Sequence, residues 1–157
     1  MQSKFSYLFM AIFFVLMACN TTDKKHEGKE KDDPKTQADS LYNQLLDEHE
    51  VGMKDWMRIE ERKKQIAKAL DSLATLPAKA NAGIGELKNK LKEASTGLQT
   101  AYEQMDSWMS SMNLDSAKND LQQRIKYLTE ENGRARQVNE VILKSLKKAD
   151  SLLKTKF

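Results

Sequence analysis

The sequence has little cysteine, little proline and few β-branched residues, and each shortage narrows the choice of fold. One cysteine in 157 residues excludes a disulfide within the chain and a metal centre built from several cysteines. Two prolines, few β-branched residues and many Ala, Leu, Lys, Glu and Gln are typical of helices. The composition therefore predicts an all-α protein.

Motifs for catalysis and nucleotide binding are absent as well. The sequence contains no HExxH, CxxC or GxSxG motif and no glycine-rich loop that would hold phosphate. The lone Gly83-Ile84-Gly85 falls at a predicted helix start, where turn formation accounts for it. Adjacent carboxylates such as Glu60-Glu61 and Glu130-Glu131 point in different directions on a helix and are expected to be solvated. We therefore predict that the protein is not an enzyme and has no catalytic residues.

Neither sign of charge is in marked excess. The chain has 26 Lys and Arg residues and 23 Asp and Glu residues, a formal net charge of +3. Proteins that bind nucleic acid usually carry a clustered basic face. We predict no nucleic-acid partner.

The apolar run near the N-terminus is short. It covers Phe5 to Met17, follows Lys4 and ends at Ala18-Cys19. This is about half the ~20 residues that a membrane-spanning helix requires. A positive start, an apolar core and a small residue at the cut are the features of a secretory signal. Residues 1–18 are therefore predicted to be a removed signal peptide.

The end of this run, Leu16-Met17-Ala18-Cys19, resembles the lipobox of bacterial lipoproteins. The resemblance implies cleavage before Cys19 and acylation of that residue with palmitate-type chains. Two or more acyl chains anchor a protein stably in a bilayer. Asn20 follows the cysteine, and similarity to enterobacterial sorting then argues against retention in the inner membrane. We expect a lipoprotein of the bacterial cell envelope, anchored in the outer membrane and facing either the periplasm or the cell exterior.

A polar segment follows the cysteine. From Asn20 to about Asp39 no large apolar residue occurs, and His26 lies within this stretch as an expected solvated residue. Such a segment cannot bury enough surface to offset its ordering entropy. We predict a lipidated, disordered tether over residues 19–35 and a helical bundle over residues 36–157.

Periodic apolar residues and helix-ending signals predict three helices. The first runs from about Pro34, capped by Asp33, to Thr75, and Leu76-Pro77 ends it. The second runs from about Asn81 to Met112-Asn113. The third is capped by Asn113 or Asp115 and continues across Asn132-Gly133. Short connections make neighbours antiparallel, so we predict an elongated antiparallel three-helix bundle with coiled-coil-like packing.

Each predicted helix has an apolar stripe expected to face the core. The first stripe contains Tyr42, Leu45, Leu46, His49, Met53, Trp56, Met57, Ile66, Leu70 and Leu73. The second contains Ile84, Leu87, Leu91, Ala94, Leu98, Ala101, Met105, Trp108 and Met112. The third contains Ala117, Leu121, Ile125, Leu128, Ala135, Val138, Ile142, Leu146, Ala149 and Leu153.

Two short segments, 49–57 and 105–112, contain every methionine and tryptophan that follows Cys19. Both include the pattern Met-x-x-Trp-Met, and an antiparallel hairpin turning near residue 81 would bring them together. Three interpretations are open: a packed bundle layer, which we favour, a partner-binding surface to which Gly52 gives close access, and a soft-metal site. The candidate residues are His49, Met53, Trp56, Met57, Met105, Trp108 and Met109.

Several of these motifs recur in a known family. They are Leu41-Tyr42, His49-Glu50 followed by Met53, Met105 with Trp108-Met109, and the lipobox. On these residues the chain resembles small lipoproteins of Bacteroidota, often labelled viral A-type inclusion protein-like and without an assigned activity. The family tends to place a second methionine seven residues after the histidine, where this chain has Trp56 and then Met57.

These patterns predict a membrane-anchored lipoprotein with a non-enzymatic structural or protein-interaction role. Its partner would be another envelope protein or a second copy of the chain. The alternative is a periplasmic Cu(I)-binding protein in which His49, Met53, Met57, Met105 and Met109 supply the ligands. Apart from that metal and the lipid on Cys19, we predict no cofactor.

Overall fold

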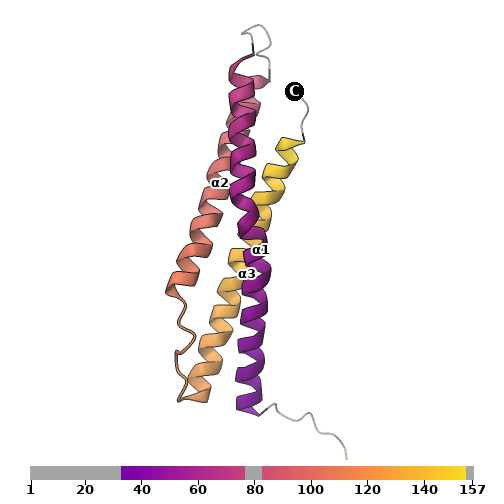
Figure 1. Ribbon diagram of the computed structural model, residues 1–157. Helices are drawn as coiled ribbons and strands as arrows, with labels where there is room; N and C mark the ends of the chain where they lie inside the picture. The colour runs from indigo at the N-terminus through magenta and orange to yellow at the C-terminus, as the bar shows by residue number, and fades with distance from the viewer. Residues whose placement is uncertain (1–32, 77–82, 155–157) are drawn as a thin grey trace, which may run out of the picture. The chain divides into compact units, whose positions relative to one another are not determined.

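The computed structural model describes residues 33–76 and 83–154, which form three helices. They are α1 (Pro34–Ala74, 41 residues), α2 (Ile84–Ser111, 28 residues) and α3 (Leu121–Leu153, 33 residues) (Figure 1). The all-α prediction is confirmed. The predicted signal peptide, Cys19 and the tether up to residue 32 lie outside the described residues.

The start of α1 agrees with the predicted signal. Pro34 occupies the first turn, where its missing N–H leaves no unsatisfied donor, and Asp33 is the N-cap residue. The Asp33 side chain makes no capping bond; its backbone carbonyl instead accepts from Gln37 N over 2.9 Å. Pro34 and Lys35 were predicted to belong to the disordered tether, but they are the first two residues of α1, so the bundle begins two residues earlier than predicted. The predicted stop at Leu76-Pro77 is close to the observed end at Ala74, and Pro77 lies outside the described residues.

Helix α2 begins later than predicted. We expected a start near Asn81 with Gly83 inside the first turn, but the first helical residue is Ile84. Gly83 is the N-cap, with a φ of 96° that glycine adopts without strain. The helix ends at Ser111, next to the predicted stop at Met112-Asn113.

The predicted start of α3 was wrong. Neither Asn113 nor Asp115 caps it: Asp120 does, and its Oδ1 accepts the backbone N–H groups of Gln122 and Gln123 over 3.1 and 3.0 Å. Residues 112–120 form a connection in which Asn113 Oδ1 accepts from Asp115 N over 3.0 Å. No helix continues from Asn113, because Ala117 has a φ of 56°, which a right-handed helix does not allow, and the Ala117 carbonyl accepts from Asp120 N in a turn.

Helix α3 is continuous through Gly133, as predicted. An interior glycine costs about 1 kcal/mol relative to alanine. The burial of the residues around Gly133 against α1 and α2 outweighs that cost, since Glu131, Asn132 and Ala135 are all buried.

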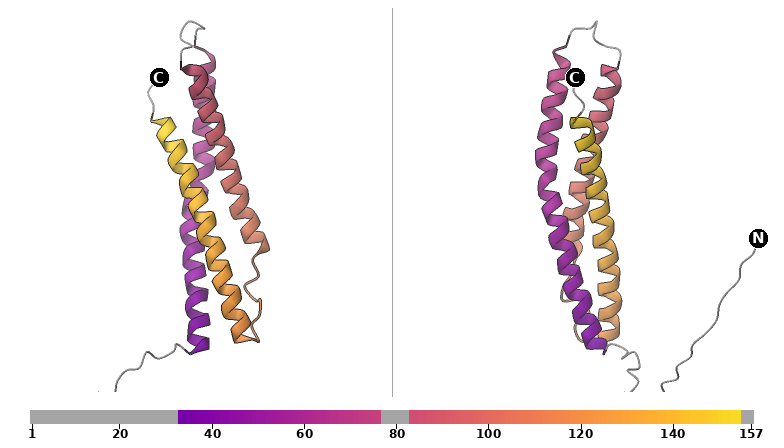
Figure 2. Two further views of the ribbon diagram at one scale, coloured as in Figure 1. Left: turned by 180° about the vertical axis from the view of Figure 1, so that it is seen from behind. Right: turned by 90° about the vertical axis from the view of Figure 1, so that its right-hand side faces the viewer.

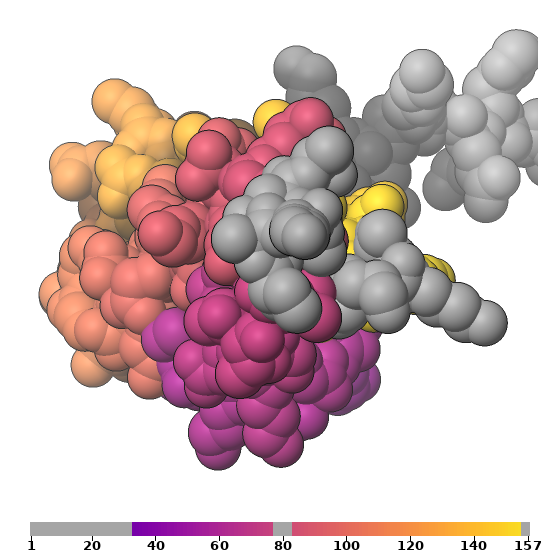
Figure 3. Space-filling model, turned by 90° about the horizontal axis from the view of Figure 1, so that it is seen from above, coloured from indigo at the N-terminus to yellow at the C-terminus, as the bar shows by residue number. Residues whose placement is uncertain are grey.

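Neighbouring helices run in opposite directions, so α1 and α3 are parallel (Figures 1 and 2). Asn132 of α3 bonds to Leu41 of α1, and Asn139 bonds to Glu48. The residue numbers thus rise in the same direction along both helices. The contact between α1 and α3 is the most extensive of the three helix pairs. Figure 3, a view from above, shows the end of α1 and the start of α2 packed next to each other.

The predicted α2 stripe forms the core on that helix. Leu91, Ala94, Leu98, Ala101, Met105 and Trp108 are all buried. On α3 the stripe is confirmed from Leu128 onward, but Ala117 lies in the connection with a φ of 56° and Leu121 is 43% exposed. On α1 the core follows an uninterrupted seven-residue spacing that the prediction caught only in part: Ala38, Leu45, Gly52, Ile59, Ile66 and Leu73.

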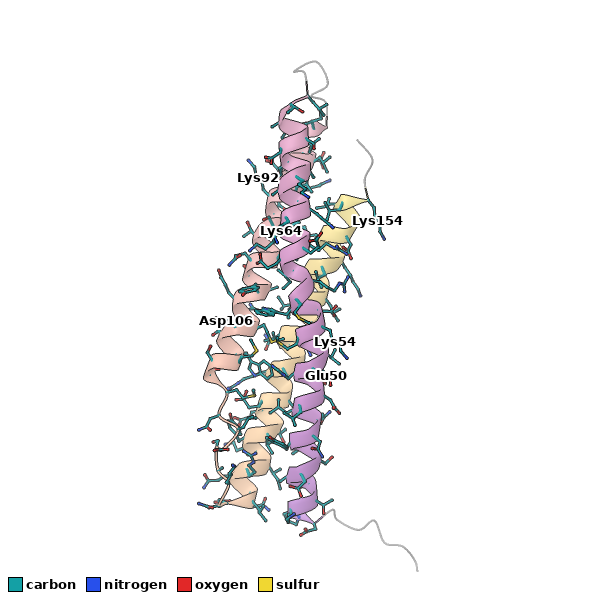
Figure 4. All side chains as sticks on the ribbon, in the orientation of Figure 1. Glu50, Lys54, Lys64, Lys92, Asp106 and Lys154 are labelled. Carbon is teal, nitrogen blue, oxygen red and sulfur yellow. The ribbon has the colours of Figure 1, made fainter. Side chains whose placement is uncertain are left out.

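Within the described ranges, none of the helices is both long and apolar enough to cross a membrane. Most of their apolar residues lie in the inward stripes, and many charged side chains lie on the outside (Figure 4). Lys64 and Lys92 are examples on α1 and α2.

Candidate functional site

Segments 49–57 and 105–112 meet across α1 and α2, as predicted, but about one helical turn from the expected register, in which Met53 to Met57 would lie opposite Met109 to Met105. His49 Nε2 lies 3.4 Å from Met109 Sδ. Trp56 stacks on Tyr102 with ring centres 4.5 Å apart, and its indole N–H donates to the Tyr102 carbonyl over 3.2 Å. His49 also lies 6.0 Å from the Trp108 ring. Helix pairing thus assembles most of the predicted cluster in one band of the bundle.

Not all seven predicted residues enter this band. Met57 is 63% exposed and points outward, so its predicted place in the packed cluster was wrong. Met53 is half-buried on the same face of α1 as His49 and Trp56. Met105 is fully buried. The helical geometry explains Met57: it follows Trp56 by one residue and is therefore turned about 100° away from it.

Gly52 lets α1 approach the other two helices closely. A Cβ at this position would overlap Asn139 Oδ1 of α3 and lie 2.5 Å from Met105 Cε of α2. Real Cβ atoms do not make such contacts. The side chains of Asn139 and Met105 therefore fill the space beside Gly52 that a larger residue would occupy.

Trp108 is tied to a buried carboxylate. Its indole N–H donates to Glu131 Oε2 over 3.0 Å, and the other Glu131 oxygen accepts from Arg134 over 2.7 Å. We expected Glu130-Glu131 to be solvated, but Glu131 is buried and that interpretation was wrong for it. The carboxylate is buried because both of its oxygens have donors.

Asn132 and Asn139 are functional-site neighbours that sequence reasoning missed. The Asn132 amide donates to the Leu41 and Leu128 carbonyls over 2.9 and 2.8 Å. The Asn139 amide donates to the Glu48 carbonyl and carboxylate over 2.9 and 3.1 Å. Both Oδ1 atoms are buried without a hydrogen-bond partner. A signal for them existed, because spacings of three and four alternate strictly from Ile125 to Leu153 when Asn132 is added to the stripe and Asn139 replaces Val138.

This asparagine pair fixes the register of α1 against α3. The two residues are seven apart, and so are the two α1 carbonyls that they reach. In coiled coils, a polar residue at a core position selects one register at a cost in stability. The two unpartnered oxygens are that cost here.

The metal hypothesis receives limited geometric support. Within the described residues no group of three or more His, Cys, Asp or Glu could hold a metal ion. Of the five predicted Cu(I) ligands, His49 and Met109 are brought within 3.4 Å of each other. Met105 is directed at Gly52, and Met57 points to solvent.

A groove of about 400 Å³ runs between α2 and α3 beside Trp108. Its lining is mostly uncharged and polar: Thr100, Gln104, Ser107, Ser111 and Gln137. Trp108 is only 5% exposed beneath it. The aromatic ring therefore offers little surface to a ligand.

The resolved pKa shifts belong to exposed ion pairs. Glu50 hydrogen-bonds to Lys54 over 2.9 Å, which lowers the carboxyl pKa and raises the ammonium pKa. Figure 4 shows both residues on the solvent side of α1, while Asp106 lies on α2 at the same level. The Glu86 and Lys90 pair behaves in the same way. These shifts come from surface pairing and do not mark a reactive group.

Comparison with models of known protein families, with curated proteins and with solved structures gave no match.

Proposed function

We propose that the protein is an envelope lipoprotein whose helical bundle binds a partner protein without catalysing a reaction. The observation that carries this proposal is an apolar strip on α1, formed by Leu46, Met53 and Met57. These residues are spaced by seven and four and so share one helix face. Leu46 is 41% exposed and Met57 is 63% exposed.

The chemistry of the strip suits protein recognition. Methionine is flexible and polarisable, and it is enriched at surfaces that engage partners. On α1 the strip lies beside the half-buried Trp56, which packs against the core cluster. A partner helix laid on the strip would extend an apolar surface that the bundle itself leaves incomplete.

Photocrosslinking in intact cells tests this role. A photoreactive amino acid at Met57 should capture one defined envelope protein or a second copy of the chain. The same amino acid at Lys147, an exposed α3 position, is the matched control. Equal capture from both positions, or no capture from Met57, contradicts partner binding through the strip.

Anchoring through Cys19 is the second part of the proposal, together with membership of the Bacteroidota lipoprotein family. Its support is the lipobox followed by a polar segment that leads to the start of α1 at Pro34. Incorporation of a palmitate analogue into the wild-type chain, and its loss in Cys19→Ser, tests the lipid. Protease digestion of whole cells tests which side of the outer membrane the bundle faces.

A Cu(I)-binding role is the alternative, favoured by the distance of 3.4 Å between His49 Nε2 and Met109 Sδ. An imidazole and a thioether suit a soft metal. Calorimetric titration with Cu(I) under reducing conditions should then give binding tighter than about 1 μM, lost in Met109→Leu and retained in Met57→Leu. Weaker binding, or equal binding by both variants, removes this alternative.

A further inference from the structure

A second hollow lies where α1 begins. It has a volume of about 400 Å³ and is lined by the start of α1, the 112–120 connection and the first turn of α3. Arg124 of α3 lines this hollow although the residue is only 8% exposed. We call it the Arg124 hollow. Its volume is within the range of roughly 300–1,000 Å³ that is usual for small-molecule sites.

The charge of Arg124 is incompletely matched by the protein. One Nη1–H donates to the Ser116 carbonyl over 2.8 Å, and the guanidinium carbon lies 5.7 Å from the centre of the Tyr42 ring. Across residues 33–76 and 83–154, Arg124 forms no ion pair with a carboxylate. A guanidinium has five N–H donors, and a buried charge is costly unless it is paired. Arg124 therefore has donors left for an anion.

The other charges at the hollow cancel in pairs. Lys35 pairs with Asp39 over 3.1 Å, and Lys118 pairs with Asp115 over 2.5 Å. Hydrogen bonding to Lys118 is the main cause of a lowered Asp115 pKa, so that carboxylate is already engaged. The charge of Arg124 also lowers the Asp115 pKa, but Arg124 forms no ion pair, so among the described residues it is the charged group of the hollow that lacks a direct partner.

The other half of the wall, beside these two ion pairs, is apolar or aromatic. Ala38, Tyr42, Leu114 and Leu121 all line the hollow. Leu121 was predicted to pack in the core, but it is 43% exposed. A buried cation with apolar side chains on part of the wall and two Lys–Asp pairs on the rest fits a molecule with one acidic group and a short hydrocarbon body.

We propose that the Arg124 hollow binds the acidic headgroup of a lipid-like anion, with Arg124 pairing with its carboxylate or phosphate oxygens. Tyr42, Leu114 and Leu121 contact the hydrocarbon next to the headgroup. Guanidinium groups bind such oxygens through two parallel hydrogen bonds. A free fatty acid and a membrane phospholipid share this chemistry. The proposal depends neither on the α1 strip nor on lipidation of Cys19.

Calorimetric titration with decanoate below its micelle concentration tests the site. The full chain should carry Cys19→Ser, so that no attached acyl chain competes. We expect a dissociation constant of about 1 mM or tighter, with the Arg124 side-chain N–H signal shifting in NMR spectra. Arg124→Gln should weaken binding about tenfold or more. Arg136→Gln, which removes an exposed guanidinium from the same helix, should leave it unchanged.

Several results would overturn the proposal. They are absence of binding, equal affinity for the uncharged 1-decanol, equal affinity for inorganic phosphate, or full binding by Arg124→Gln. If circular dichroism shows that Arg124→Gln does not fold, Leu121→Asn decides instead. It alters an exposed wall residue and should weaken decanoate binding several-fold; unchanged binding contradicts the apolar wall.

Vesicles distinguish the two sources of the ligand. Arg124-dependent sedimentation with phosphatidylglycerol vesicles, but not with phosphatidylcholine vesicles, indicates a membrane phospholipid. Decanoate binding without sedimentation indicates a free fatty acid. Sedimentation that Arg136→Gln reduces as much as Arg124→Gln does reflects general charge and counts against the site.

Discussion

The two ends of the bundle have different interiors. Toward the connection between α1 and α2, the core is aliphatic, as Ile66, Leu73, Leu91 and Leu146 illustrate. Toward the 112–120 connection, the interior contains a glycine, a tryptophan and four polar residues: Gly52, Trp108, Arg124, Glu131, Asn132 and Asn139. Helices α1 and α3 continue through both ends, but α2 ends at Ser111, and the 112–120 connection takes its place beside Arg124.

This difference separates stability from specificity. Aliphatic layers gain free energy from burial without geometric demands beyond close packing. Polar layers contribute less net free energy, because each buried group must first replace its bonds to water. They restrict the register of α1 and α3, and they place donors such as Arg124 beside a hollow. We therefore expect a binding site at the polar end of the bundle.

The largest expected effect is in the aliphatic end. Leu98→Ala removes a fully buried side chain and should lower the free energy of unfolding by about 2–5 kcal/mol. Urea unfolding followed by circular dichroism measures it. Leu46→Ala, at a 41% exposed position, is the control and should cost far less. Similar costs for both would show that this core is not tightly packed.

A smaller loss of unfolding free energy is expected where Trp108 pairs with the buried Glu131 carboxylate. Trp108→Phe deprives Glu131 of a donor and should cost about 1–3 kcal/mol. Trp56→Phe removes a half-buried bond to a neutral carbonyl and should cost about 0.5–1.5 kcal/mol. Chemical unfolding of both variants gives the comparison. A larger loss in Trp56→Phe would contradict the proposed weight of the Glu131 pairing.

Two glycine-to-alanine substitutions should change the free energy of unfolding in opposite directions. Gly52→Ala should destabilise by about 1–3 kcal/mol, because its Cβ overlaps Asn139 and Met105. Gly133→Ala meets no atom within 4 Å and should stabilise by about 0.5–1 kcal/mol through helix propensity. Thermal unfolding reports both. Stabilisation by Gly52→Ala would mean that the three helices are not in close contact there.

The smallest effect concerns the surface pair of Glu50 and Lys54. The Glu50 pKa is lowered in the folded state, chiefly by its hydrogen bond to Lys54. Its stabilising contribution is therefore complete above the ordinary pKa of 4.5 and is lost as the pH falls through the lowered value. Glu50→Gln should slightly reduce the drop in melting temperature between pH 7 and pH 3. An unchanged drop would show that the pair adds nothing to stability.

The sequence predicted the number and direction of the helices and their approximate ends, except for the start of α3. On α2 the large residues Leu91, Leu98 and Met105 recur at regular spacing, and all are buried. On α1 the prediction placed Leu46 and Met57 inside, while the core also uses Ala38 and Gly52. Alanine and glycine contribute little to a hydrophobic pattern. The larger apolar residues on the adjacent face were therefore predicted to be buried in their place.

The candidate site was predictable only where one helix pair determined it. The meeting of His49 with Met109 follows from an antiparallel hairpin of α1 and α2. The contribution of α3 does not follow from that hairpin. Glu131 and Asn139 look like solvated residues in the sequence until their hydrogen-bond partners are known. Polar residues are buried only when another segment supplies their hydrogen bonds.

The sequence by itself determined that this chain forms three amphipathic helices and that its methionines and tryptophans gather on two of them. Local periodicity and helix-ending residues are sufficient for that. Only the tertiary structure decided which polar side chains are buried and that Arg124 faces a hollow without a carboxylate partner among the described residues. Those outcomes depend on the register of α3 against α1, and register is a property of the packed helices together.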